Sequence, residues 1–184
     1  LAGLGRPGGP RAWRADGDRC RPADRIAAVT GLAAPMLTAE RTALSFLRHL
    51  SGVASVTRCL VEAGGGAVRI AGTRKTLPLL RGLQHYAVRA GGGVSGRASL
   101  DEGLVIKANH ARAVGGLGIA VARARAAASG TPIHAEAATL ADVEDALGAG
   151  AAVILFTGAS PEALDRAARL CAGRARVVVA GPIP

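Results

Sequence analysis

A strand pattern followed by a helix pattern recurs from residue 66 to the end of the 184-residue chain. Short apolar runs alternate with amphipathic stretches that begin near Ser, Thr or Pro and end at glycine. This alternation is typical of parallel βαβ architecture, and such strands are expected to be buried on both faces. The expected strands cover residues 68–71, 104–107, 133–137, 152–156 and 176–180.

Helices are expected between these strands because apolar residues recur there at helical spacing. The first is bounded by Pro78 and Gly91, the second covers 117–124, the third covers 140–147 behind a cap at Thr139, and the fourth covers 160–172. Upstream, Thr38 is expected to cap a further helix that continues toward residue 60 with a break at 51–52.

Glycine-rich segments predict where the chain divides. We expect a disordered leader over 1–14, a partial N-terminal domain with an entry helix over 15–62, and a domain of βα units over 66–184. Five strands favour either a barrel or a doubly wound sheet. Because a closed eight-stranded barrel needs roughly 200 residues or more, we expect the sheet to be incomplete.

Composition excludes several classes of protein. No apolar run approaches the roughly 18 residues of a membrane span, and the first residues lack the apolar centre of a signal peptide, so we expect a cytoplasmic protein without a membrane partner. The three cysteines form no CxxC pair, which argues against zinc and a disulfide framework. The net charge of +10 comes from arginines spread along the chain without interleaved aromatics, so we expect no nucleic-acid partner.

Lysine is rare in this chain. Only Lys75 and Lys107 occur among its 23 lysine and arginine residues. An ammonium group is a compact point charge, whereas guanidinium is a planar fork, so the two are not interchangeable. Arg74, Lys75, Lys107, Glu136 and Thr157 all lie at or just beyond the carboxyl ends of expected strands. In α/β barrels that rim carries the active site.

Several sequence blocks resemble the quinolinate phosphoribosyltransferase family. They occur in the family's order over residues 15–181 and read LTAERTALSFL at 37–47, LSGVA at 50–54, TRKT at 73–76, YAVRAGGGV at 86–94 and IK at 106–107 before Asn109-His110. The resemblance implies an α/β-sandwich N-terminal domain, here a remnant, joined to an incomplete, TIM-like parallel α/β barrel. It also implies a homodimer.

The reaction implied by the resemblance joins the ring nitrogen of quinolinate to C1′ of phosphoribosyl pyrophosphate. Pyrophosphate and CO2 leave, nicotinate mononucleotide forms for NAD biosynthesis, and Mg2+ accompanies the phosphates. The implied catalytic residues are Lys75 and Lys107. The implied substrate-binding residues are Arg41, Arg74, Lys75, Arg97, Lys107, Glu136 and Gly181. Among them, Arg41 is expected to reach the neighbouring subunit's site, and Glu136 is expected to bind the metal as well.

Four positions depart from the family's pattern. Gly96 stands where a histidine is usual, Ala108 and Thr157 stand where aspartates are usual, and Pro182 stands in the phosphate-binding glycine turn. Proline has no N–H to offer a phosphate. The cationic half of the implied site is therefore better preserved than its acidic half, and impaired turnover is expected.

Two other functions are compatible with these residues. A non-catalytic relic, acting as an anion-binding or dimerising module, would explain the lost carboxylates. A relative from the molybdenum-transport-associated group would share the TRKT and glycine blocks, although Tyr86 to Arg89 and Ile106-Lys107 look more like the quinolinate enzymes. The Gly91-Gly92-Gly93 run is by itself a weak phosphate-loop signal and also fits a helix terminator. We expect His110 and His134 to make local hydrogen bonds, and His49 and His85 to lie on helix surfaces.

Overall fold

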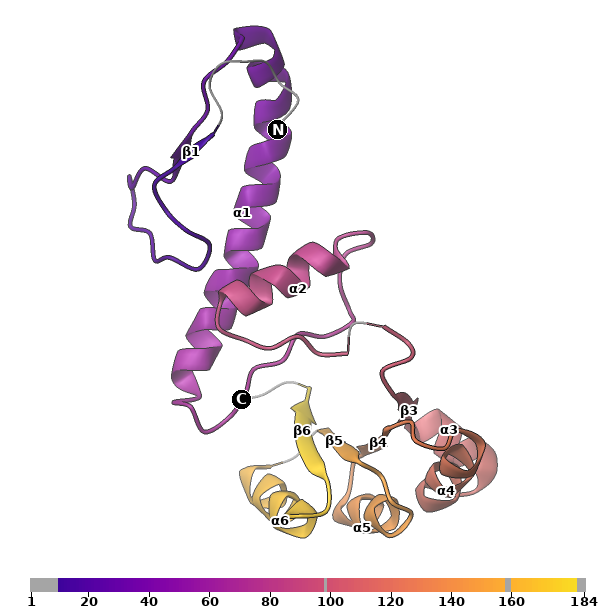
Figure 1. Cartoon of the computed structure of the whole chain (residues 1–184). Helices are drawn as coiled ribbons and strands as arrows, with labels where there is room; N and C mark the ends of the chain where they lie inside the picture. Colours follow the sequence, from indigo (N-terminus) through magenta and orange to yellow (C-terminus); the bar gives the residue numbers. More distant parts are fainter. Residues whose placement is uncertain (1–9, 98, 158–159, 182–184) are drawn as a thin grey trace. The chain divides into compact units, whose positions relative to one another are not determined.

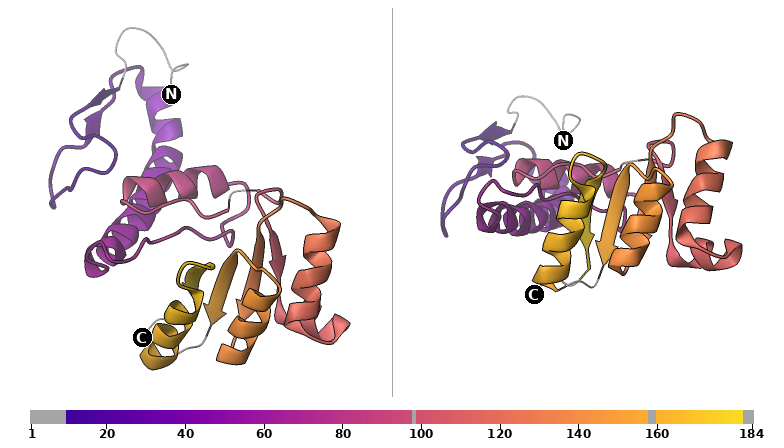
Figure 2. Two further views of the ribbon diagram at one scale, coloured as in Figure 1. Left: turned by 60° about the horizontal axis from the view of Figure 1, so that its bottom comes forward. Right: turned by 90° about the horizontal axis from the view of Figure 1, so that it is seen from below.

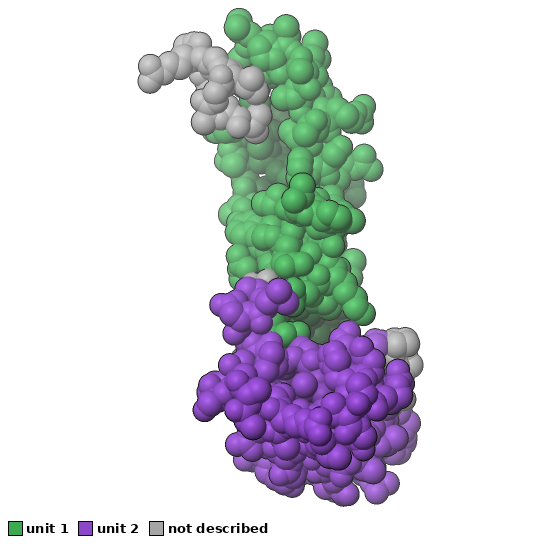
Figure 3. All heavy atoms as spheres, turned by 90° about the vertical axis from the view of Figure 1, so that its right-hand side faces the viewer, with its two compact units in different colours: residues 1–98 green, residues 99–184 purple. Residues whose placement is uncertain are grey.

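The computed structural model describes residues 10–97, 99–157 and 160–181. The chain forms two compact units, Leu1–Ala98 and Ser99–Pro184, coloured separately in Figure 3. Most of the expected leader lies outside the described residues, although Arg11 and Ala12 form a short strand.

The first unit is built on two helices, α1 (Ala33–Ala63) and α2 (Arg81–Ala90), with a short antiparallel pair of β1 (Arg11–Ala12) and β2 (Ala27–Ala28) (Figure 1). The expected cap at Thr38 is wrong, because α1 begins earlier and the Thr38 hydroxyl donates to the Ala34 carbonyl at 2.9 Å inside the helix. The expected break at 51–52 is also wrong, since α1 continues unbroken for 31 residues.

The expected strand at 68–71 does not form. Ala71 makes only an isolated parallel bridge with Val94, fixed by bonds from Gly72 N to Val94 O at 2.9 Å and from Val94 N to Ile70 O at 2.8 Å. A strand needs a continuous ladder, and here the pairing partner is the end of a glycine run rather than another apolar strand. The bridge nevertheless places residues 70–72 beside residues 93–94.

Close backbone approach explains the glycines at the end of α2. Gly91 is so close to α1 that a Cβ atom there would lie 2.4 Å from the Ala54 carbonyl oxygen. A Cβ on Gly93 would lie 2.8 Å from Cγ2 of Thr57 and 2.9 Å from the Ile70 carbonyl oxygen. The glycine run is therefore a packing and chain-termination feature in this unit, which agrees with the helix-terminator interpretation.

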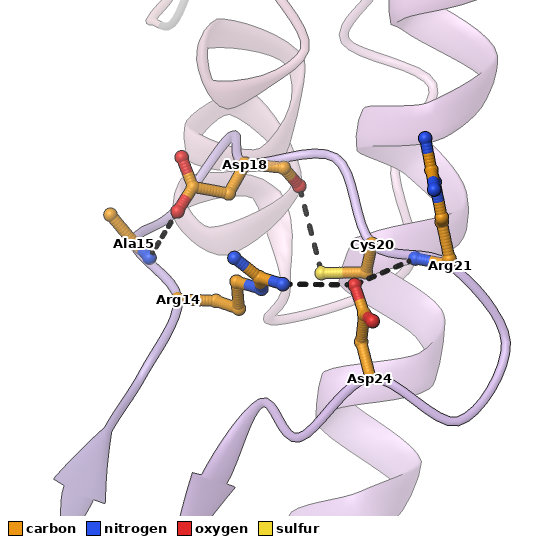
Figure 4. A network of polar contacts seen from close by, with 6 residues as sticks. All are labelled: Arg14, Ala15, Asp18, Cys20, Arg21 and Asp24. Carbon is orange, nitrogen blue, oxygen red and sulfur yellow. Dashed lines mark hydrogen bonds and ion pairs between the residues drawn. The ribbon is translucent and has the colours of Figure 1, made fainter.

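Polar contacts hold the loop between β1 and β2 (Figure 4). Arg14 pairs with Asp24 at 3.1 Å, and the Arg21 N–H donates to the same carboxylate at 3.0 Å. This backbone hydrogen bond, helped by Arg14, lowers the pKa of Asp24. The loop also contacts α2, because the Tyr86 hydroxyl donates to Asp16, and this bond raises the pKa of Tyr86.

The second unit is a four-stranded parallel sheet in the order β3 (Leu104–Ile106), β4 (Ile133–Ala137), β5 (Val153–Thr157) and β6 (Arg176–Ala180). Consecutive strands are neighbours throughout. A doubly wound sheet reverses its strand order, whereas a barrel adds each strand beside the last, so this order is of the barrel type.

Three helices cover one face of this sheet, as Figure 2 shows: α4 (Leu117–Ala127), α5 (Leu140–Gly148) and α6 (Pro161–Cys171). A fourth helix, α3 (Ala108–Val114), packs against α4. The three larger helices confirm the expected ones, with Thr139 and Ser160 accepting cap bonds from Asp142 N and Ala163 N at 3.1 and 3.2 Å. The short helix α3 was not expected from the sequence.

Burial differs between the two central strands of the second unit. Along β4, Ile133, Ala135 and Ala137 are buried against the helices, while His134 and Glu136 are only half-buried. The expectation of strands buried on both faces is therefore wrong for β4, whereas in β5 the adjacent Val153 and Ile154 are both buried. Because burial alternates along β4, the side chain of Glu136 lies on the less covered face of the sheet, near the carboxyl end of the strand. Among the residues described, no helix has both the length and the apolar character that a membrane crossing requires.

Replacing Gly91 with alanine is expected to destabilise the first unit, because the new methyl group would overlap a backbone carbonyl of α1. Overpacking of this kind costs about 1–3 kcal/mol or more. Gly82 is the matched control, since it lies in α2 with nothing within 4 Å of an added Cβ. Gly82→Ala should stabilise by about 0.5–1 kcal/mol through helix propensity. Urea unfolding measures both, and equal effects would contradict the packing explanation.

Leu79 is expected to be a site of strain. Its φ is +62°, its side chain is fully exposed, and branched residues rarely adopt the left-handed region. Leu79→Gly should therefore raise the free energy of unfolding, by about 1 kcal/mol. Leu100→Gly is the control, because Leu100 is exposed but lacks positive φ, and it should not stabilise. A fall in the thermal midpoint of Leu79→Gly would show that Leu79 is not strained.

Candidate functional site

The carboxyl ends of β3, β4 and β5 border a pocket of about 360 Å³ in the second unit. Parallel strands end at one rim, so residues far apart in the sequence meet there. Glu136 comes from β4 and Thr157 from the last position of β5. The full lining is Ala108, Ala111, Arg112, Gly115, Gly116, Leu117, Glu136, Ala138, Asp142 and Thr157.

Two acidic residues line this pocket, and they differ in what their carboxylates do. Asp142 accepts hydrogen bonds from the N–H groups of Ala138 and Thr139 at 3.1 and 2.9 Å, so it forms a reciprocal capping box at the start of α5. Glu136 makes no such cap and is half-buried in β4. Glu136 is therefore the pocket carboxylate available to a ligand.

The residues of this pocket can supply only a small part of the ligand shell of a metal ion. Within the described ranges, no three His, Cys, Asp or Glu side chains are grouped as they would be around a metal. Mg2+ at phosphate sites is often held by one or two carboxylates, with substrate phosphates and water completing its shell. Glu136 can fill that role, while Thr157 supplies a hydroxyl where a second carboxylate would complete the pair.

Lys107 lies at the boundary between β3 and α3, directly before the pocket residue Ala108. Its side chain is exposed, and its backbone N–H is bonded to Nδ1 of His110 at 3.1 Å. This bond confirms the expected local role of His110. It also holds the first turn of α3, so the base of Lys107 is fixed at the rim while its ammonium group remains solvated.

The first unit carries Arg74 and Lys75 on an irregular segment before α2. Arg74 is half-buried, and its Nε atom is buried without a hydrogen-bond partner among the described residues. Lys75 is exposed, and its N–H donates to the Thr73 hydroxyl at 3.1 Å. A buried guanidinium donor left unpaired is costly, so the position of Arg74 is one that an anionic ligand would stabilise.

Arg97 follows the segment that pairs with residues 70–72, and it is half-buried. The preceding Gly96 has no room for a side chain, because a Cβ there would lie 2.0 Å from the Gly72 carbonyl oxygen. A histidine at that position would require the two segments to separate. The close approach of the two backbone segments at Gly96 therefore leaves no room for an imidazole at this position.

The structure brings the expected site residues together in two groups. Arg74 and Lys75 lie on one segment of the first unit, with Arg97 on the segment that pairs beside it. Arg41 is exposed on α1 of the same unit. In the second unit Glu136 and Thr157 share the pocket, Lys107 borders it, and Gly181 follows β6 with φ +132°. Pro182 lies outside the described residues.

Several residues of this region were not predicted from the sequence. Arg112 lines the pocket from α3, but nothing distinguished it among the many arginines of the chain. Asp142 could have been found, because Thr139 and Asp142 have capping-box spacing. His85 was expected on a helix surface, and this is wrong: it is 4% exposed, and its Nε2 is bonded to the Thr73 carbonyl at 3.0 Å.

Comparison with known proteins agrees with this arrangement. The model of the quinolinate phosphoribosyl transferase C-terminal domain matches residues 53–183, and the model of the N-terminal domain matches residues 11–51. A probable nicotinate-nucleotide pyrophosphorylase [carboxylating] of Bacillus subtilis is 38% identical over 170 residues, which are 91% of this chain and 59% of that protein. The human nicotinate-nucleotide pyrophosphorylase [carboxylating] is 39% identical over 153 residues, 81% of this chain and 52% of that protein.

Solved structures give the same result. NadC from Streptococcus pyogenes has a TM-score of 0.89 at 39% identity and covers 96% of this chain, which in turn covers 64% of that chain. The nicotinate-nucleotide pyrophosphorylase of Francisella tularensis has a TM-score of 0.89 at 34% identity, covering 96% of this chain and 63% of its own. The chain thus spans between half and two thirds of the length of these relatives. Because family models match both its N-terminal and its larger C-terminal part, the chain belongs to the quinolinate phosphoribosyltransferase family.

Proposed function

We propose that the chain binds quinolinate and acts as a quinolinate phosphoribosyltransferase. The observation that carries this proposal is the buried Nε atom of Arg74, which has no hydrogen-bond partner among the described residues. A carboxylate of a diacid would satisfy that donor. Lys75 follows directly, and Arg97 lies on the neighbouring segment, so the first unit offers further cations to the second carboxylate.

Charge explains why several cations are needed. Quinolinate is a dianion and phosphoribosyl pyrophosphate a polyanion, so the reactants repel each other. One opposite charge at about 4 Å supplies roughly 4 kcal/mol at an effective dielectric of 20. We assign Arg41, Arg74, Lys75, Arg97 and Lys107 to this task, with Lys75 and Lys107 as the catalytic residues.

The reaction would proceed by displacement at C1′ of the ribose. The ring nitrogen forms the new bond while pyrophosphate leaves with the electron pair of the broken C–O bond. Loss of the adjacent carboxylate as CO2, with a proton taking its place on the ring, then gives nicotinate mononucleotide. Cations near the leaving pyrophosphate stabilise the charge that develops on it.

Glu136 would serve the ribose and the metal in this scheme, and Gly181 would lie near the phosphate end. When bound, Mg2+ would neutralise part of the pyrophosphate charge. Glu136 lines the pocket at the rim of the sheet and can accept from ribose hydroxyls, so we assign the sugar to this pocket. A homodimer that brings Arg41 to the neighbouring site, and a cytoplasmic location, stay predictions from the family resemblance.

A second candidate function is an anion-binding module without turnover. Thr157 favours it, because this residue lines the pocket without supplying the second carboxylate. The molybdenum-transport-associated alternative has weaker support, since the relatives named above carry nicotinate-nucleotide pyrophosphorylase or NadC names. Product formation separates the transferase from the binding module.

Quinolinate binding should depend on the cations of the first unit. In calorimetry, Arg74→Ala and Lys75→Ala are each expected to raise the Kd by about 10- to 100-fold, because a charge-assisted hydrogen bond contributes roughly 1.5–3 kcal/mol. Arg74→Lys should fall between Arg74→Ala and the unmodified chain, since it keeps the charge but loses the fork. Arg123→Ala, an exposed arginine on α4, is the charge-matched control. Absence of binding, or equal loss in the control, would remove the proposal.

Turnover should rise when the missing carboxylate is supplied. Thr157→Asp would place a second acid beside Glu136 in the pocket, and we expect at least a tenfold increase in Mg2+-dependent product formation, equivalent to about 1.4 kcal/mol in the barrier. Thr157→Asn is the matched control, because it has the shape of aspartate without the charge. Quinolinate binding without product in either variant would favour the binding module instead.

A further inference from the structure

The segment that carries Arg74 and Lys75 is held at both ends by polar side chains of α2. At one end, His85 Nε2 is bonded to the Thr73 carbonyl at 3.0 Å. At the other end, the Leu77 N–H donates to Oε1 of Gln84 at 3.0 Å. The segment has no regular secondary structure of its own, so these bonds supply the constraint that a helix or strand would otherwise provide.

The orientation of the Gln84 amide follows from its partners. A backbone N–H can only donate, so the oxygen of Gln84 must face Leu77. The NH2 group of Gln84 then faces His49 Nε2, at a distance of 2.7 Å. It can only donate, and therefore Nε2 of His49 accepts and the ring proton resides on Nδ1. Gln84 thereby links α1, α2 and the cationic segment through one side chain.

The bond at the other end of the segment is similarly determined. The Thr73 carbonyl can only accept, so His85 carries its proton on Nε2. His85 is 4% exposed, and burial of a polar ring requires a partner of this kind. The Thr73 hydroxyl in turn accepts from the Lys75 N–H at 3.1 Å. The backbone of Lys75 is thus fixed through Thr73 to α2.

We propose that Gln84 is a positioning residue for Arg74 and Lys75. It does not contact the ligand, but it fixes the far end of the segment against α1 and α2, as His85 fixes the near end. A displacement of about 1 Å in a binding or reacting group can cost two orders of magnitude in rate. The functional part of this inference depends on the proposed function, since quinolinate is the anion that the two cations would hold.

The test uses the full chain with Gln84→Met, which keeps the length of the side chain and removes both polar atoms. Leu83→Met is the matched control, because Leu83 is the neighbouring residue of α2, is 44% exposed, and has an apolar side chain that cannot hydrogen-bond to the segment. Three quantities are measured: amide hydrogen exchange at Leu77, the Kd for quinolinate by calorimetry, and the thermal midpoint.

In Gln84→Met we expect exchange at Leu77 to accelerate at least tenfold and the Kd for quinolinate to rise about tenfold or more, while unfolding stays cooperative. Leu83→Met should change neither exchange nor Kd. Gln84→Glu keeps an acceptor oxygen for the Leu77 N–H, so it should restore slow exchange at Leu77. A purely structural role would lower the thermal midpoint without a selective effect at Leu77.

Unchanged exchange at Leu77 in Gln84→Met would overturn the positioning role, and so would accelerated exchange with an unchanged Kd. If the unmodified chain binds no quinolinate, the proposed function fails. In that case exchange at Leu77 alone decides whether Gln84 holds the segment, so the two failures are distinguishable.

Discussion

Parallel pairing of β3 to β6 organises the whole of the second unit. It aligns Ile106 with Ala135, Ala137 with Phe156 and Thr157 with Ala180, so successive strands end at one rim. Helices bury the opposite side chains of the sheet in a continuous apolar core that includes Ile154, Phe156 and Val143. The pocket with Glu136 and Thr157 is a consequence of that alignment.

The first unit uses a different device to place charged side chains. Its cations lie on irregular segments, where no ladder of hydrogen bonds determines their position. Glycines allow α2 to approach α1 at the Ala54 carbonyl, and side chains of α2 then bind the Thr73 to Leu77 segment. Rigidity in this unit thus comes from helix packing and a few directed polar contacts.

The two groups of residues differ in what they offer a ligand. In the first unit, the guanidinium of Arg74 has a buried donor without a partner among the described residues. In the pocket of the second unit, Asp142 is engaged as a helix cap and Thr157 carries no charge, which leaves Glu136 as the carboxylate available to a ligand. Under the proposed function, binding of an aromatic diacid depends on the cations, whereas turnover of a sugar pyrophosphate also depends on the carboxylate.

Local sequence was sufficient to predict β4, β5 and β6 from their apolar runs, and the helix caps at Thr139 and Ser160 from cap chemistry. It was also sufficient to predict the family from the order of its motifs. All three are local signals. Only packing in three dimensions established that the expected strand at 68–71 is reduced to one bridge at Ala71. It also established that β4 is buried on one side and that α1 continues through residue 52. It also established the contacts of Gln84 and His85. Those outcomes depend on which neighbour is available to satisfy a backbone or polar group, and no local pattern encodes that neighbour.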